Sequence, residues 1–147
     1  MKRITLISLA LLFLLTAAAE SSFACSCLRS LKPLKAQVRE AYANSTAIFS
    51  GEVVEIKPSP TTPDTLAIRL KVLNTWKGKP ADEITLSTPK ESAMCGYGFE
   101  VGNTYLVYAT GAGDDLMTTN CSRTGPASDR QDIRFLDKLK RRKVRSS

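Results

Sequence analysis

The chain has 147 residues, and its 21 lysines and arginines against 14 aspartates and glutamates give a formal net charge of +7. It contains no histidine, which excludes the Ser-His and Cys-His nucleophile pairs and the usual proton shuttle of acid–base catalysis. No phosphate loop, dinucleotide fingerprint or HExxH pattern occurs. We therefore do not expect an enzyme, and we expect no cofactor and no metal of the protein's own.

Residues 1–24 have the pattern of a secretory signal peptide. Two basic residues precede an apolar run that is too short to span a bilayer. Small residues permit cleavage after Ala24, which would make Cys25 the first residue, or after Ala19. A lipid-attachment signal ending at Cys25 is a third alternative, although Ser22 stands where such signals normally have leucine.

Residues 25–147 are enough for one domain with a core but not for two. No second apolar run of spanning length follows the leader, so we expect no transmembrane segment after cleavage. We expect a secreted protein, extracellular or periplasmic, in a compartment where disulfides persist. Its four cysteines allow three pairings, and the spacing alone does not choose between them.

Helices are predicted at both ends of this domain. Residues 32–43 carry Leu34, Val38 and Tyr42 on one face. The second helix begins after Ser128 as N-cap and runs to about residue 143. Its inner side carries Ile133, Leu136, Leu139 and Lys140, and two acids, Asp129 and Asp132, suit the helix dipole in its first turn.

Five segments between the helices read as short strands, at residues 47–56, 66–72, 83–87, 105–109 and 116–119. Gly51 within the first strand predicts a bulge or sharp bend. The fourth strand is nearly all apolar and is predicted to be central. The fold class is therefore mainly β, a five-stranded OB-fold-like barrel with flanking helices. We expect one core that contains Phe49, Trp76, Tyr105 and Val107.

The segment Cys25-Ser26-Cys27 lies far from the other two cysteines, Cys95 and Cys121. A redox pair is one interpretation, but the usual redox form is Cys-x-x-Cys at a helix start. A zinc site is another, but structural zinc sites favour Cys-x-x-Cys knuckles. We therefore expect structural disulfides, which would clamp a chain end at Cys25 and suggest that the end itself is used.

The C-terminal helix ends in a basic cluster. This cluster has two interpretations: contact with an anionic partner, such as a membrane surface or a polysaccharide, or a solvated helix end whose cations suit the dipole. The leader argues against a nucleic-acid partner. The cluster comprises Lys138, Lys140, Arg141, Arg142, Lys143 and Arg145.

Motifs along nearly the whole domain resemble the netrin-like domain, and most closely the tissue inhibitors of metalloproteinases. The matching segments are Cys25-Ser26-Cys27, the helix, Ala47 to Val54, Trp76-Lys77-Gly78, Cys95-Gly96, Gly102, Tyr105 to Ala109 and Cys121-Ser122-Arg123. The chain lacks the family's third disulfide in this domain and the inhibitors' separate C-terminal domain. It therefore looks like a short, bacterial-type member.

The resemblance implies an OB-type barrel and the disulfide pairs Cys25–Cys95 and Cys27–Cys121. In the inhibitors, the α-amino nitrogen and carbonyl oxygen of the first cysteine bind the catalytic zinc of a target protease, and the next side chain enters its specificity pocket. These roles would fall on Cys25 and Ser26, with Cys27 completing the inhibitory wedge. The expected partner is an extracellular or periplasmic zinc metalloprotease. The alternative is a netrin-like interaction or adhesion module without inhibitory activity.

Overall fold

The computed structural model describes residues 25–28, 30–79, 81–113 and 115–145. The predicted signal peptide, residues 1–24, lies outside the described residues. No helix within the described ranges is long and apolar enough to cross a membrane.

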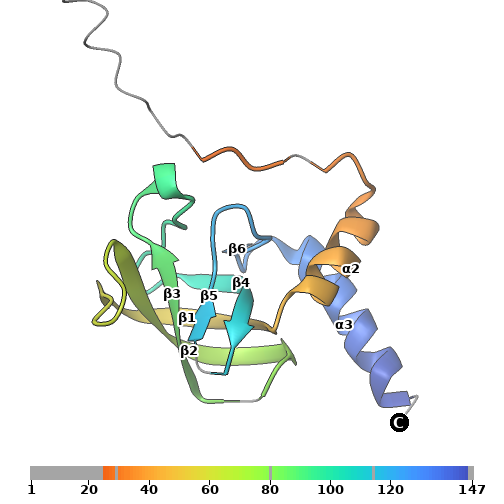
Figure 1. Ribbon diagram of the computed structural model, residues 1–147. Coiled ribbons are helices and arrows are strands. Elements are labelled where there is room, and N and C mark those ends of the chain that lie inside the picture. Colours follow the sequence, from red (N-terminus) through yellow and green to blue (C-terminus); the bar gives the residue numbers. More distant parts are fainter. Residues whose placement is uncertain (1–24, 29, 80, 114, 146–147) are drawn as a thin grey trace, which may run out of the picture.

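Five strands form a closed barrel, as the sequence predicts (Figure 1). Neighbouring strands follow the order β1-β2-β3-β5-β4, and β4 pairs with β1 to close the ring. All these pairs are antiparallel except β3 with β5, which is parallel. The barrel strands are β1 (Ala47–Pro58), β2 (Thr65–Lys77), β3 (Glu83–Pro89), β4 (Thr104–Ala112) and β5 (Asp115–Met117).

The strands β1, β2, β3 and β4 are longer than their apolar patterns predict, whereas β5 is a residue shorter and starts one residue earlier. Two elements were not predicted at all. The 3-10 helix η1 (Ser92–Met94) follows β3, and the two-residue strand β6 (Gly125–Pro126) pairs with β4. Both are too short to carry a periodic pattern, so only the tertiary fold defines them.

An irregularity occurs at Gly51, as predicted, but the extra residue lies on the partner strand. Ser50 pairs with Asn74 and Gly51 with Val72, so Leu73 has no partner on β1. A Cβ at Gly51 would lie 2.9 Å from the carbonyl oxygen of Lys71. This close approach of two backbones requires glycine.

The domain has two hydrophobic cores because β1 and β4 are buried on both faces. The barrel interior holds Phe49, Val53, Ile68, Leu70, Leu86, Tyr105 and Val107. Alternate residues of the same strands point outward, where they meet the helices. This second cluster consists of Val38, Ile48, Leu106, Tyr108 and Leu136.

The prediction that Trp76 shares the barrel core is wrong. Trp76 is half-buried and packs against the second cluster. Trp76 is also unpaired, because Phe49 pairs with Thr75 and Ile48 with Lys77, so the regular alternation of β2 is broken at both Leu73 and Trp76. The indole Nε1 donates a hydrogen bond of 2.8 Å to Asp137 Oδ1 in the C-terminal helix.

Helix α2 (Leu34–Asn44) and helix α3 (Arg130–Arg145) lie together on one side of the barrel (Figure 1). The predicted inner faces are confirmed at Val38 and Leu136, which are completely buried, but not at Leu139, which belongs to neither core. Lys140 was predicted on the inner side, but it is exposed, and its Nζ donates to the carbonyl oxygen of Thr75 at 2.8 Å. Asp132 lies in the first turn of α3, as predicted, and it is also buried in a side-chain network.

Candidate functional site

Two disulfides hold the segment Cys25–Cys27 on the barrel. Cys25 is bonded to Cys95 and Cys27 to Cys121, with Cα–Cα distances of 5.1 and 5.2 Å. These are the pairs that the family resemblance implies. A redox pair formed by Cys25 with Cys27 is therefore absent, because both sulfurs are bonded to distant partners.

The two bridges lie side by side. Cys25 Sγ is 3.6 Å from Cys121 Sγ, and Cys121 Sγ is 3.8 Å from Cys95 Sγ. The ligand atoms of Cys25, Cys27 and Cys121 all lie within 4.8 Å of one another, a spacing compatible with a metal. None of the four cysteines is free, however, and a disulfide sulfur is not the thiolate that zinc requires.

Asn120 organises the backbone around these bridges. Its N–H donates to the carbonyl oxygen of Cys95 at 2.9 Å, which joins the two loops that carry the anchoring cysteines. Its Oδ1 lies 3.5 Å from Cys25 Sγ and 3.6 Å from Cys27 Sγ, as contacts rather than hydrogen bonds, since disulfide sulfurs carry no proton. Cys95 itself has a left-handed backbone with φ of 66°, at the end of η1.

Side chains between the two anchoring cysteines, and in the residues that follow Cys27, are exposed to solvent. Ser26 is exposed between the two bonded cysteines. Leu28 and Leu31 have exposed fractions of 101% and 98%, and Met94, next to Cys95, is 46% exposed. Folding alone gives no reason for two leucines on one short segment to be fully exposed.

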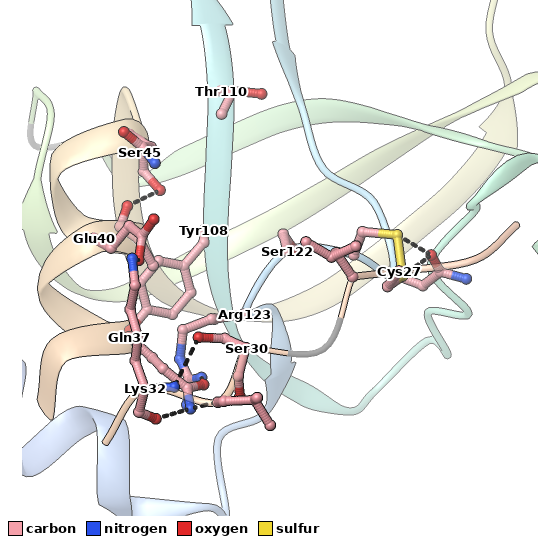
Figure 2. Close-up of a pocket in the computed structure, with 16 residues that line it drawn as sticks. Cys27, Ser30, Lys32, Gln37, Glu40, Ser45, Tyr108, Thr110, Ser122 and Arg123 are labelled. Carbon is pink, nitrogen blue, oxygen red and sulfur yellow. Dashed lines mark hydrogen bonds and ion pairs between the residues drawn. A yellow bond between two sulfur atoms is a disulfide. The ribbon is translucent and has the colours of Figure 1, made fainter. Parts of the chain in front are cut away.

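A side-chain network that includes Arg123, Gln37 and Lys32 lies beside the segment (Figure 2). Arg123, two residues after Cys121, donates from Nε and Nη2 to the two carboxylate oxygens of Asp132, both at 2.7 Å. Its Nη1 donates to Gln37 Oε1 at 2.8 Å, and Gln37 Nε2 donates to the carbonyl oxygen of Lys32 at 2.6 Å. The network therefore connects α3, the Cys121 loop, α2 and the N-terminal segment.

Tyr108 completes this network from β4, where its hydroxyl donates to Asp132 Oδ2 at 3.0 Å. Burial, and then the negative charge of Asp132, raise the pKa of the Tyr108 hydroxyl far above its ordinary value. The hydrogen bonds to Asp132 raise the pKa of the Arg123 guanidinium. Both groups therefore keep their protons, and hence their donor roles, at physiological pH.

An open cavity of about 970 Å³ lies next to the network, between the N-terminal segment, α2 and the Cys121 loop (Figure 2). Its lining includes Cys27, Leu28 and Leu31, together with Tyr108 and Arg123. A 2.7 Å ion pair between Lys32 and Glu40 joins two of its walls. Cys27 and the residues that follow it thus form one wall of this cavity.

Sequence reasoning named the four cysteines and Ser26 but assigned no role to the side chains that support them. Arg123 was noted only as part of a matching motif, and Asn120 and Gln37 were not singled out. Their positions give no local signal, because each acts on a partner that the fold brings near. Asp132 lies nine residues from Arg123, and Gln37 lies 86 residues from it.

Comparison with known proteins adds no family to this description. No protein-family model matches the chain, and no curated protein matches it either.

Proposed function

We propose that the protein inhibits a zinc metalloprotease with its segment Cys25-Ser26-Cys27, after cleavage behind Ala24. The observation that carries this proposal is the double anchoring of the segment. Cys25 and Cys27 are each bonded to a different loop, while Ser26 between them is exposed. A chain end held in this way pays little ordering cost when it binds.

The chemistry of the chain end supports the proposal. A catalytic zinc keeps one coordination position open for water. The neutral α-amine and the carbonyl oxygen of a first residue Cys25 can chelate the metal there and displace that water. Ser26 is then the side chain next to the metal, directed into the specificity pocket of the protease. The exposed Leu28 adds apolar surface that loses its water on binding.

The disulfides also fit the expected location. Two disulfides are typical of proteins in oxidising compartments, which are the periplasm and the extracellular space. A secreted inhibitor would meet its protease there.

N-terminal sequencing of the secreted protein is the first test. A terminus at Cys25 leaves the free amine that the mechanism needs, whereas a terminus at Glu20 removes the mechanism. The second test compares the mature protein with a variant that carries one alanine before Cys25, against a panel of zinc proteases. The addition converts the amine nitrogen of Cys25 into an amide, a very poor zinc ligand, so inhibition should disappear.

A matched control carries the same alanine after Ser147 and should inhibit like the unmodified protein. Both variants should keep the same unfolding midpoint, because neither changes a core residue or a cysteine. Acetylation of the α-amine should abolish inhibition, whereas modification of lysines alone should not. Equal inhibition by the extended and native forms would show that the chain end is not the zinc ligand.

A further inference from the structure

Helices α2 and α3 together form a basic face that is separate from the disulfide-anchored segment. Exposed cations of both helices surround one small pocket, to which α2 contributes Lys35 and Arg39 and α3 contributes Lys138 and Arg142. Arg134 and Arg141 extend the face along α3. The sequence predicted a basic cluster on the C-terminal helix only, and the contribution of α2 arises from the packing of the two helices.

The floor of this pocket is apolar. It is lined by Val38, Phe135 and Leu139 and has a volume of about 140 Å³. Lys138 Nζ lies 6.0 Å from the centre of the Phe135 ring, close to the aromatic floor. Leu139 lines this pocket but belongs to neither hydrophobic core, so the packing of the cores does not depend on it.

The charge of the face is not neutralised within the described part of the protein. None of its six cations takes part in an ion pair between described residues. Asp137, a carboxylate that borders the face, accepts the hydrogen bond of the Trp76 indole. Lys140 does not belong to the face, because it is bound to the backbone of β2.

We propose that this face binds the surface of an anionic phospholipid membrane. The cations of both helices contact phosphate headgroups, while the pocket between them takes an apolar part of a lipid. Charge complementarity selects an anionic surface. The apolar floor favours a lipid over a purely hydrophilic polyanion, because a polysaccharide or nucleic acid backbone has nothing to place there.

Vesicle flotation tests this proposal with the folded mature protein. Vesicles of phosphatidylcholine are compared with vesicles of phosphatidylcholine and phosphatidylglycerol mixed three to one. Binding should require phosphatidylglycerol and should weaken as salt is added. The double variant Lys35→Gln/Arg39→Gln should bind roughly 30-fold more weakly, since each basic residue near an anionic surface contributes about a fivefold factor.

The matched control is Lys71→Gln/Lys90→Gln, which removes the same charge from exposed positions outside the pocket lining. It should bind nearly as well as the unmodified protein. The variant Leu139→Gln leaves the net charge unchanged and should also weaken vesicle binding. Circular dichroism should show that all three variants are folded, as expected for residues outside both cores.

Two results would overturn the proposal. The first is equal binding by the Lys35/Arg39 variant and its control, because the pocket between the helices would then have no role. The second is that dextran sulfate binds the unmodified protein and Leu139→Gln equally well while phosphatidylglycerol vesicles do not bind. The face would then recognise a soluble polyanion. Neither result bears on protease inhibition, because the face shares no residue with Cys25–Cys27.

Discussion

Replacing Arg123 with methionine should destabilise the domain more than any other change of a charged side chain described above. The guanidinium makes three hydrogen bonds, two to Asp132 and one to Gln37, all between 2.7 and 2.8 Å. Methionine fills part of the volume of the arginine stem but offers no donor. Among the described residues, Asp132 then keeps only the hydroxyl of Tyr108 as a partner, and Asp132 is itself only 7% exposed.

The magnitude follows from this partial burial. Breaking a fully buried ion pair by removing one partner costs roughly 3–5 kcal/mol, because the remaining charge is unpaired. The side chain of Arg123 is 28% exposed and that of Asp132 is 10% exposed, so water can partly solvate the remaining carboxylate. We therefore expect Arg123→Met to lower the free energy of unfolding by about 2–3 kcal/mol. This is a large fraction of the stability of a small domain.

Urea unfolding, followed by circular dichroism with the disulfides intact, measures this difference. The control is Arg39→Met on the exposed face of α2, which should change the free energy of unfolding by less than about 0.5 kcal/mol. A double-mutant cycle with Asp132→Ala isolates the interaction between the two side chains. If Arg123→Met were as stable as the Arg39 control, or the cycle gave no coupling, the network would not support the Cys121 loop.

Three further outcomes are expected. Val107→Ala should lower the free energy of unfolding by about 1–3 kcal/mol, since Val107 is fully buried in the barrel; an unchanged urea midpoint would contradict this. The change Cys27→Ser/Cys121→Ser should cost about 3.6 kcal/mol in the chain-entropy model, because with Cys25–Cys95 intact the second bridge closes a loop of only about 28 residues. A loss of stability near zero would show that the unfolded chain is no less ordered without the Cys27–Cys121 bridge than with it. Tyr108 should remain protonated above pH 10, where the unfolded chain ionises, so stability should fall by about 1.4 kcal/mol per pH unit there. Tyr108→Phe should make this slope, measured as urea midpoints against pH, shallower without removing it, because burial also raises the pKa of Tyr97. An unchanged slope would exclude Tyr108 as a source.

The barrel could be predicted from the sequence because its strands carry a local signal. The alternation of Leu66, Ile68 and Leu70 and the apolar run of β4 depend only on neighbouring residues. Trp76 was misplaced because it lies beyond the predicted strand 66–72, whereas β2 continues to Lys77 through irregular pairing with β1. Only the partner strand reveals that Leu73 is unpaired. A single extra residue moves the following side chains to the other face.

The site could be predicted only where covalent chemistry marks it. Cysteines in a Cys-x-Cys pattern stand out in any chain, and the family resemblance supplied their partners. The residues that support them carry no such mark, because an arginine, a glutamine and an aspartate are ordinary surface residues until the fold brings them together. Asp132 shows this most clearly, since its first-turn position on α3 was predicted, but its burial as the partner of Arg123 was not.

The same network connects the anchored segment with the basic face. Gln37 lies on α2 between Lys35 and Arg39, and Asp132 lies on α3, so Arg123 joins both helices of the basic face to the loop of Cys121. The Gln37 amide in turn donates a hydrogen bond to the backbone carbonyl of Lys32, which precedes α2. Loss of Arg123 should therefore loosen the helix pair and the segment together, whereas Lys35→Gln/Arg39→Gln and an added alanine before Cys25 each affect one surface only. An Arg123→Met protein that lost membrane binding and protease inhibition in parallel, with both disulfides intact, would be the expected consequence of this shared support.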